Sequence, residues 1–304
     1  MSSKIVTPRK TIATAHKWVF TSRIRPNAFS WRSSSAAATR IKEAVAEIQR
    51  VARTDPVTAA EGAVRLIERL SPALEHVDSS SGALGSAVNR AIESLVPVIS
   101  SASVSISDRE KWLERLYEAH AADRIPYIET LADFWGELCA TREIASAWAD
   151  RMIGITRMAL SPDKTLRGHY HGTSACLSAL LRAGRYEEIE SVLAHTDFWH
   201  YKCYAVKALA AQLRHDDAIA LADSLRGHWT PEGAVNRLCE RILLEAGRVG
   251  EAYQRFGLIS HTQSTYLATF RAVAKTIPRP GSNELPLLLP PPVEPGNEML
   301  GTIP

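Results

Sequence analysis

The chain has 304 residues, of which 45% are hydrophobic and 23% are charged, and its formal net charge is +3. This composition is typical of a globular protein with a sizeable core and excludes a chain that is disordered throughout. No apolar run reaches the roughly 20 residues that a helix needs to cross a bilayer, so the sequence predicts no membrane-spanning segment.

The first 40 residues form a basic segment that contains no Asp or Glu. Three interpretations are open for it. It could be a flexible arm that binds nucleic acid or an anionic surface, or an organellar transit peptide. It could also be a packed helix whose partners are acidic positions elsewhere in the fold. The apolar side chains in this segment, among them Trp18, Phe20 and Phe29, favour the packed helix.

Residues 41–160 predict an irregular succession of helices. Ile41, Val45 and Ile48 recur at the spacing i, i+4 and i+7, which places them on one face of a helix. The alternation of apolar and polar residues that marks a strand is nearly absent from the chain. We therefore expect an all-α fold.

Several helix boundaries in residues 41–160 are predicted from proline and capping residues. Asp55 is suited to cap a helix whose first residue is Pro56, because that position needs no N–H group. Pro72 predicts the start of a further short helix that runs through Leu74. The phrase from Ser107 to Glu110 has the spacing of a capping box.

Residues 161–275 contain a repeated pattern. The similar phrases are Ala183–Ile189, Gln212–Ala218 and Ala246–Ala252. Their second residues, Gly184, Leu213 and Gly247, are 29 and then 34 residues apart, close to the tetratricopeptide period of about 34. Each phrase predicts a left-handed cap, then an Arg, then acidic residues in the first turn of a second helix. We expect an antiparallel helix-pair solenoid of tetratricopeptide type with a right-handed superhelix.

Residues 276–304 differ from the rest of the chain because they are rich in proline and leucine. The prolines are Pro278, Pro280, Pro286, Pro290, Pro291, Pro292, Pro295 and Pro304. Proline lacks the N–H group that a helix interior needs, so the sequence predicts an extended or disordered tail.

Four cysteines are present: Cys139, Cys176, Cys203 and Cys239. None belongs to a CxxC or CxC pair, which argues against a disulfide framework and against a thiolate zinc site. We therefore expect buried, reduced thiols and a cytoplasmic location.

Five phrases are distinctive: Trp112–Leu116, Trp135–Ala140, Ala147–Arg151, His171–Leu177 and Thr265–Arg271. They resemble a bacterial family whose members combine a domain of unknown function with tetratricopeptide-like helices, and some of whose relatives are filed with SWIM-type zinc-finger proteins. The resemblance covers residues 17–275 and implies a helical-repeat fold but no particular activity. The SWIM zinc pattern is absent, so no zinc is implied. Family members continue with further repeats after residue 271, which implies that this chain has a truncated or frameshifted C-terminus.

One candidate surface combines histidines with aromatic residues. Its members are Arg167, His169, His171, Trp199 and His200. His169 and His171 could clamp an ion, yet no carboxylate or second cysteine follows at a ligand spacing, so we predict no metal and no cofactor. These residues could instead bind a partner on the concave face of the solenoid, although the sequence favours packing of Trp199 and Tyr201 between helices.

The sequence contains no catalytic signature. Neither GxxxxGK[ST] nor GxGxxG is present, and Gly172-Thr173-Ser174 lacks the strand–turn–helix context of a nucleophile elbow. We therefore expect a protein- or peptide-binding scaffold rather than an enzyme. A nucleic-acid-associated protein that uses the basic N-terminal segment is the first alternative, and an enzyme on a helical scaffold is the second.

Overall fold

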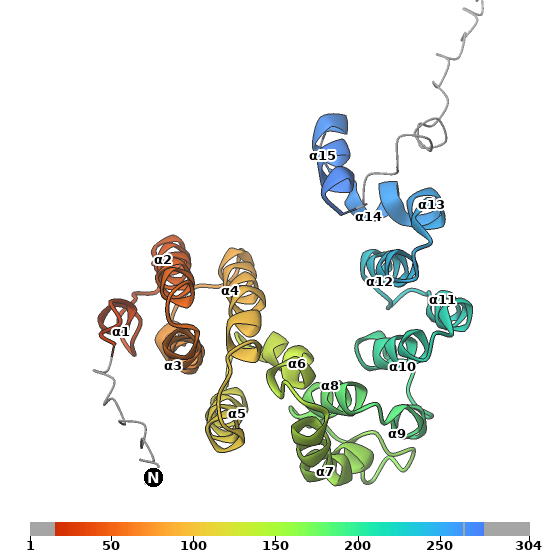
Figure 1. Cartoon of the computed structure of the whole chain (residues 1–304), viewed down its shortest axis with the longest axis horizontal. Helices are drawn as coiled ribbons and strands as arrows, with labels where there is room; N and C mark the ends of the chain where they lie inside the picture. Colours follow the sequence, from red (N-terminus) through yellow and green to blue (C-terminus); the bar gives the residue numbers. More distant parts are fainter. Residues whose placement is uncertain (1–15, 264, 277–304) are drawn as a thin grey trace, which may run out of the picture. The chain divides into compact units, whose positions relative to one another are not determined.

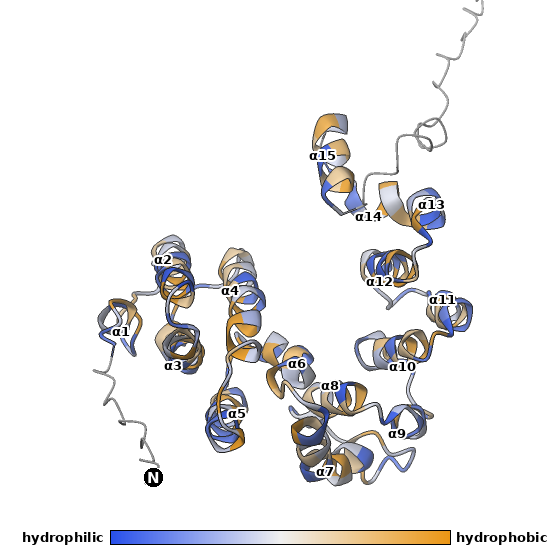
Figure 2. Cartoon of the chain, in the orientation of Figure 1, coloured by the Kyte–Doolittle hydropathy of each residue, from blue (hydrophilic) through white to orange (hydrophobic). Residues whose placement is uncertain are grey.

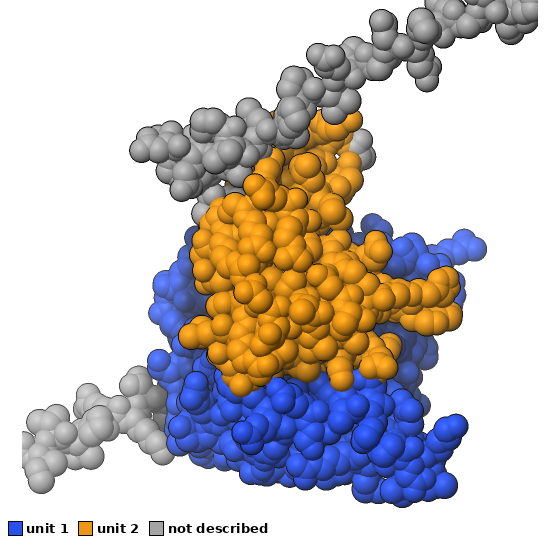
Figure 3. All heavy atoms as spheres, turned by 90° about the vertical axis from the view of Figure 1, so that its right-hand side faces the viewer, with its two compact units in different colours: residues 1–196 blue, residues 197–304 orange. Residues whose placement is uncertain are grey.

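A computed structural model describes residues 16–263 and 265–276. Within these residues every regular element is a helix and no strand occurs, which confirms the all-α fold. The chain divides into two compact units, with unit 1 ending at Thr196 and unit 2 beginning at Asp197 (Figure 3). None of the described helices combines the length and the apolar composition needed to span a membrane.

Unit 1 arranges its main helices in two rows (Figure 1). The first row contains α2 (Ser34–Ala52), α4 (Ala83–Ser100), α6 (Trp135–Leu138) and α8 (Thr173–Ala183). The second row contains α3 (Pro56–Leu74), α5 (Ile106–Ala121), α7 (Arg142–Ala159) and α9 (Tyr186–Val192). The short α1 (Phe20–Arg23) packs on α2, and the 3₁₀ helix η1 (Glu129–Phe134) leads into α6. Consecutive helices of the first row contact one another, so unit 1 is a stack of helix pairs.

The start of α3 is the one predicted from its capping residues. The carboxylate of Asp55 accepts a hydrogen bond from the N–H of Thr58 at 3.0 Å, and Pro56 is the first residue of the helix. The predicted break at Pro72 is wrong, because Pro72 lies inside α3. Its neighbour Leu70 is completely buried, and we attribute the continuous helix to such packing, which outweighs the single hydrogen bond that proline cannot make.

The predicted capping box at the start of α5 is displaced by two residues. Ser105, not Ser107, caps the helix, since its hydroxyl accepts a hydrogen bond from the N–H of Asp108 at 3.1 Å. Glu110 therefore lies deeper in α5 and does not reach back to the cap. A run of several serines offers more than one capping position, and the side-chain spacing alone does not select among them.

The described part of the basic N-terminal segment belongs to unit 1 and packs on its helices. Its buried side chains are Trp18, Phe20, Ile24 and Phe29. The carboxylate of Glu47 in α2 accepts hydrogen bonds from the N–H groups of Val19 and Phe20 at 2.8 and 3.2 Å. Arg23 forms an ion pair with Glu43 at 2.6 Å. These contacts agree with the packed interpretation for residues 16–40, whereas residues 1–15 lie outside the described residues.

Helices α6 and α8 approach each other closely at Gly136. The N–H of Gly136 donates a hydrogen bond to the hydroxyl of Ser178 at 3.0 Å, and that hydroxyl donates to the carbonyl oxygen of Asp133 at 2.8 Å. A Cβ atom at Gly136 would lie 2.3 Å from the carbonyl oxygen of Ser178. Only glycine therefore permits this approach of the two helices.

Unit 2 continues the pattern of helix pairs. It contains α10 (Trp199–Ala211), α11 (His215–Ser224), α12 (Glu232–Glu245), α13 (Val249–Ala252), α14 (Leu258–His261) and α15 (Tyr266–Thr276), with a π-helical turn over Tyr253–Gly257. Its core includes Trp199, Val206, Leu209, Ile219, Val235, Ile242 and Phe256. The last helix, α15, has apolar residues on its exposed side as well, since Tyr266, Leu267 and Phe270 are exposed (Figure 2).

The three repeated turns share one conformation, as the sequence predicts. Gly184, Leu213 and Gly247 have φ angles of +78°, +62° and +74°. In each turn the N–H of the following arginine donates to a carbonyl five residues earlier: Arg185 to Leu180, Arg214 to Leu209 and Arg248 to Leu243. The arginine side chain then pairs with an acidic residue three positions later: Glu188, Asp217 or Glu251. Each phrase therefore encodes one complete helix–turn–helix connection.

The repeated turns are distributed over both units. The first, at Gly184, belongs to unit 1, and those at Leu213 and Gly247 belong to unit 2. The turn at Gly184 belongs to unit 1 because α8 packs against both α6 and α7. Residues 277–304, where the sequence predicts a proline-rich tail, lie outside the described residues.

Candidate functional site

The five residues of the predicted partner surface are divided between the two units. Arg167, His169 and His171 are exposed in the segment that precedes α8 in unit 1. Trp199 and His200 begin α10 in unit 2. Trp199 is only 8% exposed and belongs to the core of that unit, so its ring is not available to a partner.

The histidines before α8 are part of an anchored segment. The ring of His171 lies 4.6 Å from that of His169 and 6.4 Å from that of the buried His120 in α5. The hydroxyl groups of Tyr170 and Tyr117 share a hydrogen bond of 2.8 Å, which fastens the segment to α5. Among the described residues, no group of three His, Cys, Asp or Glu side chains is arranged to hold a metal ion.

The buried cysteines are unsuited to act as nucleophiles. Burial raises the pKa of Cys139 to about 12 and the pKa values of Cys176 and Cys239 to about 11. These thiols therefore stay protonated at neutral pH, whereas a reactive cysteine is a thiolate.

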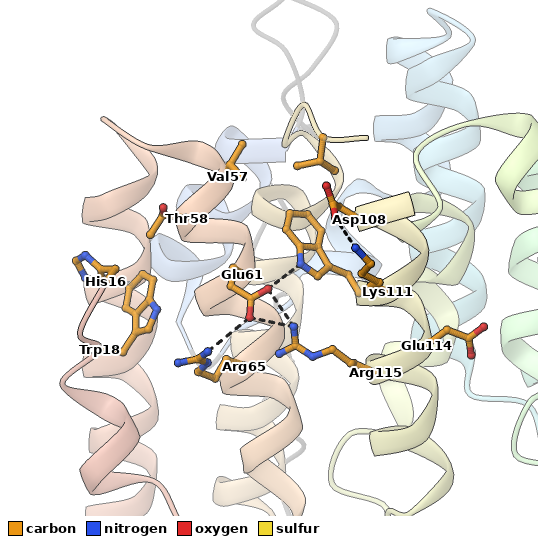
Figure 4. Close-up of a pocket in the computed structure, with 12 residues that line it drawn as sticks. His16, Trp18, Val57, Thr58, Glu61, Arg65, Asp108, Lys111, Glu114 and Arg115 are labelled. Carbon is orange, nitrogen blue, oxygen red and sulfur yellow. Dashed lines mark hydrogen bonds and ion pairs between the residues drawn. The ribbon is translucent and has the colours of Figure 1, made fainter. Parts of the chain in front are cut away.

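The first pocket lies between α3 and α5, and it has a volume of about 660 Å³ (Figure 4). The carboxylate of Glu61 lies between Trp112 and Arg115, and it accepts hydrogen bonds from both, at 2.8 and 2.9 Å. Arg115 also forms two hydrogen bonds to Glu68, at 2.8 and 2.6 Å, and these bonds raise its pKa. The centre of this pocket is therefore a network that joins α3 to α5.

The remaining charges around the first pocket are also engaged. Lys111 pairs with Asp108 at 2.9 Å (Figure 4), and Glu114 pairs with Arg151 of α7 at 2.5 Å. Arg65 lies 3.8 Å from Glu61. A ligand in this pocket would have to compete with these internal pairs, so its volume alone does not make it the best binding site.

A second pocket is a groove between α2 and α4, in the first row of unit 1. Its volume is about 410 Å³. The lining residues are Ser35, Ala38, Thr39, Ile41, Lys42 and Val45 from α2, and Ala87, Arg90, Ala91 and Ser94 from α4. Ile41 and Ala91 form a buried apolar floor. The groove exists because the facing positions Ala38, Ala87 and Ala91 have small side chains that leave space between the two helices.

The charges of the α2–α4 groove have a single sign. Lys42 and Arg90 are both exposed, and no Asp or Glu is among the residues that line the groove. Within the part of the chain that the structure describes, neither side chain forms an ion pair or hydrogen bond, in contrast to the cations around Glu61. The two acidic residues of α2, Glu43 and Glu47, contact the N-terminal segment instead.

A third pocket lies beside α6 and α8, which belong to the same row of helices. Its volume is about 560 Å³, and it is lined by Arg142 and Arg182 together with Asp133 and Glu137. Arg182 also donates a hydrogen bond to the carbonyl oxygen of Ala140. This pocket therefore presents both signs of charge, unlike the α2–α4 groove.

The structure places this chain in the class of all-α helical-repeat proteins, with open grooves along one row of helices. The chain matches no family model, no curated protein and no solved structure among those with which it was compared.

Sequence reasoning did not single out Lys42 and Arg90. One feature of the sequence could have indicated them. Glu43 and Glu47 are four residues apart and lie on one face of their helix, whereas Lys42 lies on a neighbouring face.

Proposed function

We propose that this chain is a protein-binding scaffold of the tetratricopeptide-like kind, and that the first row of unit 1 binds a segment of another protein. The observation that carries the proposal is the α2–α4 groove, which combines an apolar floor at Ile41 and Ala91 with a polar rim. Recognition of a peptide by a helical groove uses this combination, because apolar contacts supply affinity and the rim sets orientation.

The resemblance to a bacterial family with tetratricopeptide-like helices supports the same proposal. Stacks of helix pairs present long open surfaces rather than enclosed cavities, and such surfaces suit extended segments of other proteins. The high pKa values of Cys139, Cys176 and Cys239 also favour a binding role over thiol chemistry.

Filling the groove tests the proposal. Ala87 is half-buried at the edge of the groove, so Ala87→Trp places an indole in it, whereas Ser86→Trp adds the same ring on an exposed neighbour outside the lining. Each variant and the parent chain would be purified from the native host and their bound proteins identified by mass spectrometry. We expect proteins that co-purify with the parent and with Ser86→Trp to be lost from Ala87→Trp.

One result would contradict the proposal that the α2–α4 groove binds a partner. If circular dichroism shows that Ala87→Trp is folded and it retains the same bound proteins as the parent chain, the groove is not the binding surface.

A further inference from the structure

We infer that the α2–α4 groove binds an acidic segment, in which Glu or Asp side chains of the partner pair with Lys42 and Arg90. The inference rests on the proposed function, since it names the chemistry of the segment that the first row binds. It starts from the contrast between three pockets formed by described residues of unit 1. Of the three pockets described above, the α2–α4 groove alone is lined by cations without a carboxylate.

The charge separation on α2 makes the groove electropositive. Glu43 pairs with Arg23 at 2.6 Å, and Glu47 accepts the N–H groups of Val19 and Phe20. Both carboxylates are thus engaged by the N-terminal segment and do not line the groove. Lys42 lines the groove from the same helix, and Arg90 lines it from α4. Binding of carboxylates would provide the counter-charges that these two cations lack.

The hydroxyl groups of the groove favour a peptide over a bare anion. Thr39 donates its hydroxyl hydrogen to the carbonyl oxygen of Ser35 at 3.0 Å, and Ser94 donates to the carbonyl oxygen of Arg90 at 2.8 Å. Since these hydrogens are engaged within their own helices, the two oxygens are free to act as acceptors. A peptide backbone supplies N–H donors for them, whereas phosphate or a free carboxylate offers mainly acceptors.

The length of the groove fits a short extended segment. The lining residues of α2 run from Ser35 to Val45. With a rise of about 1.5 Å per residue, this corresponds to about 15 Å along the helix. An extended peptide rises about 3.3 Å per residue, so four or five residues fit along the groove. The apolar floor at Ile41 and Ala91 provides a place for one apolar side chain between the acidic ones.

The test measures binding of three labelled peptides to the full chain by fluorescence polarisation. One peptide is rich in Glu with a central Leu, the second has Gln in place of every Glu, and the third has Lys. We expect the Glu peptide to bind about tenfold more tightly than the Gln peptide, with an affinity that falls as salt is added. The Lys peptide should not bind.

Charge-removing variants locate the binding. Lys42→Gln and Arg90→Gln should each weaken binding of the Glu peptide roughly two- to fivefold, the range of a single exposed ion pair. Arg50→Gln is the matched control, because Arg50 is an exposed cation of α2 that does not line the groove. This variant lowers the net charge equally but should leave the affinity unchanged.

Three results would overturn the inference. The first is equal binding of the Glu and Gln peptides, and the second is an equal loss of affinity in Arg50→Gln. The third is tighter binding of a single-stranded RNA of the same charge, with the same dependence on Lys42 and Arg90. If Ala87→Trp abolishes binding of host proteins while the Glu peptide fails to bind, the proposed function stands and only the acidic chemistry is refuted.

Discussion

Leu213 has a backbone conformation that is unfavourable for a residue with a side chain. Its φ angle is +62°, in the left-handed region, where Gly184 and Gly247 occupy the equivalent turns. A side chain in this region costs about 1–2 kcal/mol relative to the ordinary helical conformation. The side chain of Leu213 is 79% exposed, so little packing compensates for that cost. The turn is therefore kept by its backbone hydrogen bonds rather than by its central residue.

We therefore expect Leu213→Gly to stabilise the protein. The free energy of unfolding should rise by about 1 kcal/mol, since glycine adopts this conformation without a Cβ clash. Gly247→Ala, at the equivalent turn, should lower it by a similar amount. Urea unfolding followed by circular dichroism measures both changes. A decrease for Leu213→Gly would mean that the exposed leucine makes contacts that matter more than its backbone strain.

His120 couples the stability of unit 1 to pH. Its side chain is buried, and this burial lowers its pKa below the ordinary value, an effect that the nearby Asp123 partly opposes. The folded state thus prefers the neutral ring, while the unfolded state binds a proton at about pH 6.5. The stabilisation is fully present above that pH and is lost as the pH falls below it.

We expect His120→Gln to reduce this pH dependence. The parent chain should unfold at lower urea concentrations as the pH is lowered from 7 to 5, and the variant should show a smaller decrease over the same range. His195→Gln, which changes an exposed histidine of unit 1, should leave the dependence as it is. Equal pH profiles for the parent and His120→Gln would contradict the assignment.

At the scale of the helices, the contact between α6 and α8 depends on a glycine. A Cβ atom at Gly136 would lie 2.3 Å from a backbone oxygen of α8 and 2.7 Å from the Cβ of Arg182. Neither of these atoms is the far end of a flexible side chain, so the helices themselves would have to separate. The α6–α8 pocket, which Gly136 and Arg182 both line, would change shape with them.

Gly136→Ala should accordingly destabilise unit 1 by about 2 kcal/mol, as expected for overpacking of a close contact. Gly154→Ala provides the matched control within α7, because a Cβ there would have no atom within 4 Å. That substitution should stabilise the helix by about 0.5–1 kcal/mol, since alanine has the higher helix propensity. Thermal unfolding of the two variants distinguishes a steric effect from a general effect of adding a methyl group.

Helix boundaries show where local chemistry was sufficient for prediction. The start of α3 follows from Asp55 and Pro56 because a cap is formed by residues within one turn. The continuation of α3 through Pro72 depends on burial of its neighbours, which the local sequence does not reveal. The capping box predicted at Ser107 is wrong by two residues, because the structure uses Ser105 as the cap of α5.

At the scale of the whole molecule, the folded part of unit 1 includes the described N-terminal segment. Trp18 is 4% exposed, and a Cβ at Gly62 of α3 would lie 2.2 Å from its ring. Residues 16–33 are thus part of the folded unit rather than an appendage to it. The packing of this segment also engages Glu43 and Glu47, so it contributes indirectly to the positive charge of the α2–α4 groove.

Trp18→Ala should lower the free energy of unfolding by about 3–5 kcal/mol, as loss of a large buried aromatic side chain does. Trp31→Ala is the control from the same segment, because Trp31 is 64% exposed and should contribute less than about 0.5 kcal/mol. Urea unfolding followed by near-ultraviolet circular dichroism measures the free energy of unfolding of both variants. If Trp18→Ala is as stable as the parent chain, burial of Trp18 does not contribute to the stability of the protein.

The sequence by itself determined the helical class and the three repeated turns. Each turn is built from a left-handed residue, an arginine and an acidic residue within seven positions, so short-range interactions suffice to specify it. The tertiary structure alone decided that the first row of unit 1 contains an open groove whose charged lining residues are both cations. Lys42 and Arg90 lie 48 residues apart in the sequence. Their significance comes from the groove that both line, in which no Asp or Glu is among the lining residues, and that depends on how α2 and α4 pack together.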